Sequence, residues 1–344
     1  MNAVLTDARR GHPGLYWFAV AMAGLATVLV VASIVDQRTV LGAPLWFKPL
    51  KFAISFVAYA GALAWMLGQL RERAVRRTGW LLVAASAIEM VLIVAQAARG
   101  VRSHFNDDDA AGITLYSIMG VTIVVLYLAT FAIALRFLRE PGRDRASGLA
   151  IRLGLGIGLV GLSVGYLMVG AGAHAIGIPD GGPGLALVGW STTGGDLRIG
   201  HFLGMHALQL LPLLAAGLAA VGGERLDVTA RTRIVVAAAA GYLGVVLLVT
   251  WQALRAQPLL APDGLTLGAL AVLAFGTGAA VLVAWRAPGR RTPGPPHLRP
   301  PHSRPHLGLI PSPPGQEPTR DRNPPWTPRP SSTSPSPSPC PSGH

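Results

Sequence analysis

Long apolar runs, separated by short polar connections, recur along the first 286 residues. Each run is close to the roughly 20 residues that a helix needs to cross the hydrocarbon core of a bilayer. The pattern predicts an all-α fold, a polytopic integral membrane bundle of about eight transmembrane helices. We place them at about residues 15–35, 50–70, 79–98, 113–138, 149–172, 199–221, 234–254 and 265–285.

Composition supports a membrane protein and removes other classes. Charged residues make up only 13% of the chain, against about 25% in soluble domains. The net charge of +13 comes from arginines in short connections and in the C-terminal segment, so we predict the lipid bilayer as partner and no nucleic acid. The only cysteine, Cys340, excludes an internal disulfide and a cysteine metal site.

The distribution of arginines predicts the topology. Clusters follow the second, fourth, sixth and eighth helices, whereas the other connections carry the acidic residues. The positive-inside rule therefore places both termini in the cytoplasm, in a multi-pass protein of the plasma membrane. The first run, 21 residues from Leu15 to Val35, exceeds the 7–15 residues of a signal-peptide core, so it is predicted to remain as a helix.

The chain changes character after residue 286. Residues 287–344 are rich in proline, serine and arginine. Such a segment cannot bury enough apolar surface to offset the entropy of ordering, so we predict a disordered cytoplasmic tail. A passive tail is the favoured interpretation over a ligand for a proline-recognising module.

Glycines in the fifth predicted helix form pairs at four-residue spacing, Gly154/Gly158 and Gly161/Gly165. In lipid this spacing lets two helix backbones approach closely. We therefore predict that this helix is a tightly packed central one. The glycine pattern also matches a dinucleotide fingerprint, but that fingerprint requires a preceding strand, and this stretch lies within a membrane span.

The sixth predicted helix carries Arg198, His201, His206 and Gln209, in a span that should be apolar. Ionisable residues inside a membrane segment are costly and mark a candidate functional site. At about 100° per residue these side chains fall within an arc of roughly 140°. We predict that they face the bundle interior together. The five-residue separation of the histidines makes a chelate formed by these two alone unfavourable.

Glu89 lies near the middle of the third predicted helix. A bare carboxylate there would be expensive, so it is expected to be protonated or paired. The candidate partners are the histidines of the sixth helix, Lys51 and Arg152. The functional interpretation is a catalytic or proton-handling carboxylate; a structural ion pair is the alternative.

Further polar residues are predicted at the extracytoplasmic mouth of the bundle. Gln96, Arg99 and His104 lie there, and His174 lies on the same side. Lys48 and Lys51 are the only lysines and start the second helix on this side, against the positive-inside rule. At i, i+3 they share one helix face and could hold a carboxylate, a phosphate or a lipid headgroup. Snorkelling to the interface is the alternative.

Three functions stay open on these residues. In the first, histidines bind a divalent metal ion or haem for a membrane-embedded redox or hydrolytic reaction on a small-molecule or lipid substrate. The second is a proton-coupled transporter of a small, anionic solute, and the third a structural or partner-binding protein. The candidate metal ligands are His104, His174, His201 and His206; the catalytic candidate is Glu89; the substrate-binding candidates are Lys48, Lys51, Gln96, Arg99, Arg198 and Gln209.

Overall fold

The computed structural model describes residues 2–70, 73–139, 144–222 and 226–286. The helices are α1 (Asn2–Gly11), α2 (Pro13–Val35), α3 (Phe47–Leu67), α4 (Arg73–Ala98), α5 (Ala110–Arg139), α6 (Arg145–Ala171), α7 (Leu197–Gly222), α8 (Val228–Leu254) and α9 (Gly264–Arg286). Two short hairpins pair β1 (Thr39–Val40) with β2 (Ala43–Pro44), and β3 (Ala175–Ile176) with β4 (Gly195–Asp196).

Eight helices in the described residues, α2 to α9, are long and apolar enough to cross a membrane. They coincide with the eight predicted spans, which confirms the all-α, polytopic membrane fold. Many of their large apolar side chains are exposed, such as Val28, Val121 and Phe275. In a bilayer these side chains face lipid. The predicted tail, residues 287–344, lies outside the described residues.

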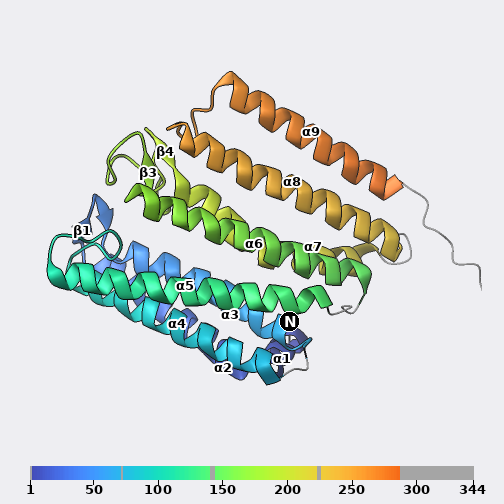
Figure 1. Ribbon diagram of the computed structural model, residues 1–344, viewed down its shortest axis with the longest axis horizontal. Helices are drawn as coiled ribbons and strands as arrows, with labels where there is room; N and C mark the ends of the chain where they lie inside the picture. The colour runs from blue at the N-terminus through green and yellow to red at the C-terminus, as the bar shows by residue number, and fades with distance from the viewer. Residues whose placement is uncertain (1, 71–72, 140–143, 223–225, 287–344) are drawn as a thin grey trace, which may run out of the picture. The chain divides into compact units, whose positions relative to one another are not determined.

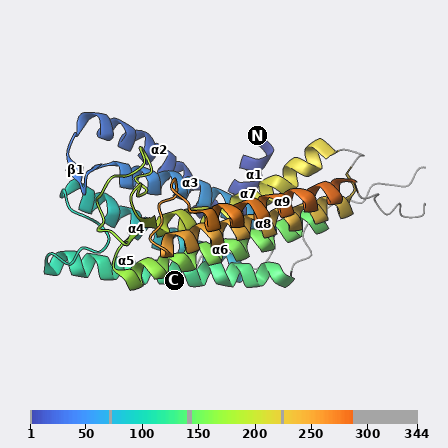
Figure 2. The same ribbon diagram turned by 90° about the horizontal axis from the view of Figure 1, so that it is seen from above.

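The membrane helices form two groups, α2–α5 and α6–α9 (Figure 1). The groups meet where α5 contacts α6 and where α3 contacts α7. The view from above places α2 and α3 along one side, and α5 and α6 along the other (Figure 2). A site formed by α3, α4 and α7 therefore draws on both groups.

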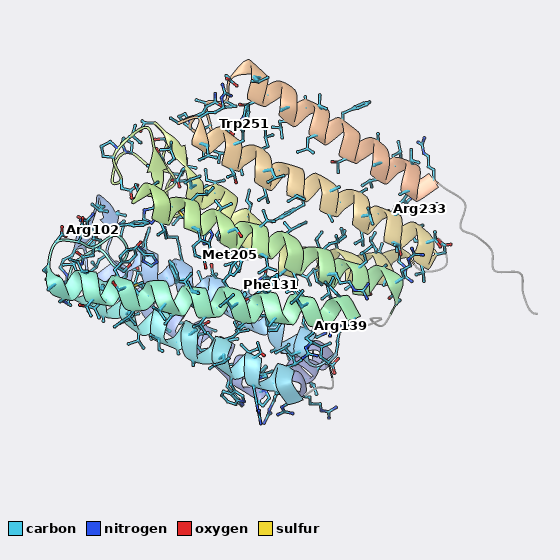
Figure 3. The ribbon with its side chains drawn as sticks, viewed as in Figure 1. Arg102, Phe131, Arg139, Met205, Arg233 and Trp251 are labelled. Carbon is cyan, nitrogen blue, oxygen red and sulfur yellow. The ribbon has the colours of Figure 1, made fainter. Side chains whose placement is uncertain are left out.

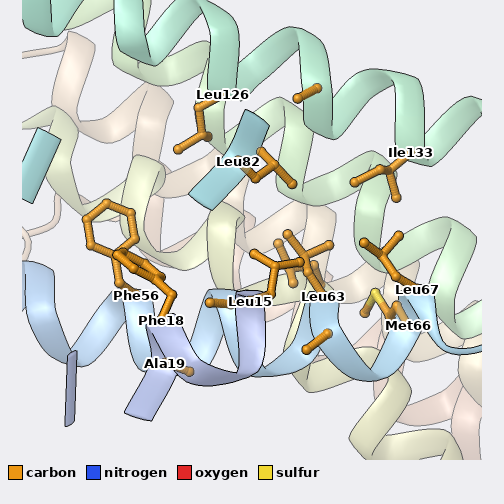
Figure 4. Packing of buried hydrophobic residues seen from close by; sticks show 14 of the residues in the cluster. Leu15, Phe18, Ala19, Phe56, Leu63, Met66, Leu67, Leu82, Leu126 and Ile133 are labelled. Carbon is orange, nitrogen blue, oxygen red and sulfur yellow. The ribbon is translucent and has the colours of Figure 1, made fainter. Parts of the chain in front are cut away.

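The first group is held by an apolar core that α2, α3, α4 and α5 share. Leu15, Phe56, Leu63, Leu82 and Ile133 are among its buried members (Figure 4). Phe18 packs edge-on against Phe56, with ring centroids 5.7 Å apart. Between α3 and α5, Tyr59 and Thr130 add a 2.6 Å hydrogen bond within the apolar surroundings.

The second group is organised by the close contact of α6 with α7. A Cβ on Gly161 would overlap the backbone of Gly204, and a Cβ on Gly154 would lie 2.9 Å from the carbonyl oxygen of Ala207. Only glycine permits this approach. The prediction of a tightly packed central helix is therefore confirmed, and the glycine spacing is the physical reason for it.

The N-terminal segment, which the sequence marked only as short and polar, forms α1 and a buried cap. His12 is fully buried. Its Nδ1 accepts a 3.1 Å hydrogen bond from the Leu15 amide at the start of α2, and its Nε2 lies 2.9 Å from the Arg76 carbonyl oxygen of α4. These bonds join α2 to α4, so His12 has a structural role.

The connections alternate between the two ends of the bundle. One end carries residues 36–46, 99–109, 172–196 and 255–263, and we call it the site end. Arg102 lies there, whereas Arg139 and Arg233 lie at the opposite end (Figure 3). At the opposite end, α1 precedes α2 (Figure 1). The site end holds most of the polar residues that the sequence selected.

Candidate functional site

Lys48 and Lys51 lie in the first turn and a half of α3, at the site end. Lys51 Nζ donates a 2.8 Å hydrogen bond to the carbonyl oxygen of Val188, which joins α3 to the connection between α6 and α7. Lys48 is half-buried. Among the described residues, no hydrogen bond or ion pair is made by its ammonium group, although the charges of Lys51, Arg198 and Glu89 act on it.

Arg198, at the start of α7, is paired with Asp196. Its Nε and Nη2 lie 2.9 and 2.6 Å from the two oxygens of the Asp196 carboxylate. Nη2 also donates a 2.6 Å bond to the Gly189 carbonyl oxygen. Asp196 is 1% exposed and accepts further bonds from the amides of Ser191 and Arg198. This fork fixes the entry of the chain into α7.

Glu89 is fully buried in α4, and its partners differ from all three that the sequence suggested. Its Oε2 lies 2.9 Å from Thr122 Oγ1 of α5, and its Oε1 lies 3.6 Å from Nε2 of His104. Oε1 has no hydrogen-bond partner among the described residues. Lys51 instead binds Val188, and Arg152 donates to the Phe137 carbonyl oxygen.

His104 occupies an aromatic cluster at the mouth of the first helix group. Its ring lies 5.9 Å from Phe52, 6.4 Å from Phe105 and 6.3 Å from Tyr116, between centroids. Burial, reinforced by the positive charge of Lys48, holds the pKa of His104 well below its ordinary value. The imidazole is therefore neutral near pH 7, and its contact with Glu89 is not an ion pair.

His174 and Asp180 form a second pair in the connection between α6 and α7. His174 Nδ1 lies 2.8 Å from Asp180 Oδ2, and the amides of His174 and Ala175 also donate to this carboxylate. Burial opposes ionisation of Asp180, but these hydrogen bonds prevail and lower its pKa below the usual range. Burial lowers the pKa of His174, so a neutral ring donates its Nδ1–H.

The two histidines of α7 have different surroundings. His201 Nδ1 lies 2.8 Å from the Gly161 carbonyl oxygen of α6. His206 packs edge-on against Phe202, with centroids 4.4 Å apart, and Phe202 is 38% exposed. His201 faces α6, and His206 lies beside Phe202 although its Nε2 atom is buried. The inward-facing polar arc therefore stays a prediction. Helical angles alone do not say where neighbouring helices stand.

The remaining candidate residues are Gln96, Arg99 and Gln209. Arg99 Nη1 donates a 2.7 Å bond to Gln96 Oε1, and Gln96 is fully buried. Gln96 Nε2 and Gln209 Oε1 are buried atoms without a hydrogen bond in the described part of the chain. The structure thus brings Lys48, Lys51, Arg198, Glu89, His104 and His174 to one end, and His206 and Gln209 lie further along α7.

The predicted histidine ligands do not form a ready metal site. Within residues 2–70, 73–139, 144–222 and 226–286, no group of three or more His, Cys, Asp or Glu side chains could hold a metal ion. His104 and His174 both contact the ring of Phe105, whereas His201 contacts the Gly161 carbonyl oxygen and His206 the ring of Phe202. What the arrangement offers instead is three cationic donors, Lys48, Lys51 and Arg198, near the carboxyl groups of Glu89, Asp180 and Asp196.

Several groups that bind the site residues were not identified from the sequence. Thr122 is one of three threonines in the apolar helix α5, and threonines often bond the backbone of their own helix. Backbone carbonyl groups also take part, and side-chain identity does not reveal them; they belong to Val188, Gly189 and Gly161. Asp180 and Asp196 were visible as acidic residues, but nothing in their spacing indicated His174 or Arg198 as their partners.

Acid is expected to destabilise the fold through His104. Because folding lowers its pKa, the unfolded chain binds the proton first as the pH falls below about 6.5, and the free energy of unfolding then decreases. His104→Gln should flatten that decline by about 1.4 kcal/mol per pH unit below this point. Thermal unfolding of the purified protein across about pH 5–7 measures this slope.

Tyr116→Phe, in the same aromatic cluster, is the control and should leave the slope unchanged. An equal slope in wild type and His104→Gln would contradict the role of His104 in the acid sensitivity.

Comparisons of the chain with protein-family models, with curated proteins and with solved structures find no match.

Proposed function

We propose that this membrane protein binds a small anion at the site end and transports it across the membrane, with Glu89 exchanging a proton. The observation that carries the proposal is the convergence of Lys48, Lys51 and Arg198, drawn from two helix groups. Of these three cations, Arg198 alone forms an ion pair with a described residue, which is Asp196. Lys51 is held by a neutral carbonyl group, and Lys48 by no described partner.

Electrostatics favours an anion in this position. A buried or half-buried ammonium group without a partner is costly, and an anionic oxygen would offset the cost through a charge-assisted hydrogen bond. Lys48 also experiences the charges of Lys51 and Arg198. An anion placed among the three would relieve their mutual repulsion, which a cation or an apolar ligand would not.

The position of the site between two helix groups supports transport. Transporters commonly place the substrate at the interface of two bundles that rock against each other. Here α3 and α4 belong to one group and α7 to the other. Pro212 inside α7 adds a break in the hydrogen-bond ladder of a helix that forms part of the site.

The environment of Glu89 supports a protonatable role. Thr122 Oγ1 lies 2.9 Å from Glu89 Oε2 and 2.8 Å from the Met119 carbonyl oxygen, and a hydroxyl group has one hydrogen to donate. A protonated Glu89 would donate to Thr122 and release that hydrogen for Met119. His104, neutral and 3.6 Å away, is the nearest group that could pass a proton.

The arginine distribution supports an orientation for this activity. Arg139 and Arg233 mark the end opposite the site (Figure 3), and the positive-inside rule places that end in the cytoplasm. The site would then open to the extracytoplasmic face of the plasma membrane, with the N-terminus inside.

Proteoliposomes test the proposal. Uptake of labelled phosphate, sulfate, acetate or succinate is measured with and without an inward proton gradient. Currents on a solid-supported membrane are recorded in parallel, because one proton carried with a monovalent anion moves no net charge. Wild type is expected to transport at least one anion. Lys48→Ala should reduce this transport at least tenfold, since a charge-assisted bond is worth about 1.5–3 kcal/mol. Glu89→Gln should remove its dependence on the proton gradient.

Arg102→Ala is the matched control, because Arg102 is a cation of the same end whose charge is already paired with Asp107 and Asp108. It should leave the transport unchanged. Absence of both uptake and current with every anion, or equal transport in Lys48→Ala and wild type, would contradict the proposal. Loss of folded protein alone in Lys48→Ala and Glu89→Gln would favour the structural interpretation.

Histidine ligation of a metal ion or haem is the second candidate. One observation favours it: His174 and His201 each use Nδ1, for Asp180 and for the Gly161 carbonyl, and Nε2 makes no bond to any described residue. Metal-binding histidines are commonly oriented by such a bond at the other nitrogen. Elemental analysis and a Soret band in the purified protein test this candidate, and absence of both would remove it.

A further inference from the structure

We propose that residues 184–191 form a displaceable lid over the anion site, and that the substrate is an oxyanion that takes the place of two of the lid's carbonyl oxygens. This inference rests on the proposed function, because it assumes that the cationic cluster binds an anion. It adds the chemical class of that anion and the way in which the site opens.

The segment 184–191 is a compact unit closed by its own backbone. Gly184 and Ser191 form an isolated antiparallel bridge. The Leu185 amide donates a 2.8 Å bond to the Trp190 carbonyl, and the Gly189 amide a 2.7 Å bond to the Leu185 carbonyl. The amides of this unit are protected only while it stays closed, so their hydrogen exchange reports its opening. We call it the lid loop.

Two cations tie the lid loop to the helices through consecutive carbonyl groups. Lys51 of α3 binds the Val188 oxygen at 2.8 Å, and Arg198 of α7 binds the Gly189 oxygen at 2.6 Å. These cations come from the two helix groups, so the lid loop bridges the groups at the site end. Releasing both ties would free the two groups from this bridge.

The carbonyl oxygens occupy the positions that an oxyanion would take. A carbonyl oxygen carries a partial charge, whereas carboxylate, phosphate or sulfate oxygens share a full one, so a charge-assisted bond to them is about twice as strong. Two donors on separate side chains also favour a ligand with at least two acceptor atoms, which a halide lacks. Lys48, without a described partner, would supply a further donor to the oxyanion.

The closed lid loop carries strain that would favour its release. Leu187 has φ 68°, the left-handed region that side chains with a Cβ rarely adopt, and it is 73% exposed. Such a residue costs of order 1 kcal/mol and persists where surrounding contacts hold it. The ties at Val188 and Gly189 directly follow Leu187. The Ser191 amide on Asp196 and the Trp190 ring against Phe202 hold the far end of the loop and would serve as its hinge.

Hydrogen exchange of the purified full chain, read by mass spectrometry, tests the lid. Phosphate, sulfate and acetate are added in turn, with chloride as the comparison, and binding is followed in the same samples by thermal shift. In wild type, exchange in residues 184–191 should rise about tenfold with an oxyanion, the factor for one charge-assisted hydrogen bond. Chloride should have no effect.

Variants distinguish loss of the bond between Lys51 and the Val188 carbonyl oxygen from general destabilisation of the fold. Lys51→Met should raise exchange in the lid loop about tenfold without any anion, and Lys51→Arg, which keeps a donor, should restore slow exchange. Arg102→Met is the matched control, since Arg102 binds Asp107 and Asp108 and not the lid loop. Exchange in the apolar core of α3 reports whether each variant is folded.

The outcomes distinguish the lid from the proposed function. Oxyanions that shift the melting temperature but leave exchange in residues 184–191 unchanged or slower would overturn the lid and leave anion binding intact. Opening by chloride would overturn the oxyanion class. If no anion alters the melting temperature or the exchange, both the lid and the proposed function are overturned.

Discussion

Replacing Gly161 by leucine is expected to abolish the folded protein. A Cβ at this position would already overlap the backbone of Gly204 on α7, and a backbone cannot move aside as a side chain can. The two helices would have to separate, which costs about 3 kcal/mol, the upper end of the usual range for overpacking, and breaks the bond between His201 and the Gly161 carbonyl oxygen. The yield of monodisperse protein in size-exclusion chromatography measures the effect.

Gly156→Leu provides the control for this prediction. Gly156 lies on the same helix, but no atom of another part of the structure stands within 4 Å of the position of its Cβ. Its replacement should leave the yield near that of wild type. Similar yields for the two variants would show that α6 and α7 are not in direct backbone contact.

Replacing Asp196 by alanine is expected to cost about 3 kcal/mol of stability, the low end for breaking a buried ion pair. Asp196 is 1% exposed and binds Arg198 through both oxygens as well as the Ser191 amide. Its loss leaves a partly buried guanidinium with only the Gly189 carbonyl. Because about a third of the Arg198 side chain is exposed, water moderates the loss.

Asp36→Ala is the matched control, because Asp36 and Arg38 form the same fork at the same two-residue separation, with the Arg38 side chain 55% exposed. Asp36 also accepts a bond from Trp46, as Asp196 accepts one from Ser191. Exposed pairs contribute little to stability, so this variant should melt close to wild type. Thermal unfolding in detergent compares the two. If Asp36→Ala destabilises the protein as much as Asp196→Ala, burial is not the cause of the effect.

The hydrophobic pattern and glycine spacing determined the fold class. Eight apolar runs of nearly constant length admit only membrane helices, because backbone polar groups in lipid must be satisfied within the segment. The spacing of Gly154, Gly158, Gly161 and Gly165 likewise predicted a close helix contact, since a missing Cβ acts locally. Both features follow from residues near one another in the sequence.

The gathering of candidate site residues at one end was also predictable, but their partners were not. Alternating spans bring every second connection to the same end, so Lys48, Gln96, His104 and His174 had to share it. Glu89 was correctly identified as needing a neighbour. Its contacts with Thr122 and His104 depend on how α4, α5 and the connection between them pack, which no spacing encodes.

The sequence by itself therefore determined which segments span the membrane, which ends they share and which polar residues are out of place there. Only the tertiary structure decided the partner of each polar side chain. Lys51 binds the Val188 carbonyl, and Arg198 binds Asp196 and the Gly189 carbonyl. The ring of His206 packs against Phe202. The physical reason is that helical periodicity fixes angles around one axis. The direction of the neighbouring helices, and the backbone carbonyl groups that meet a side chain, arise only when the whole bundle packs.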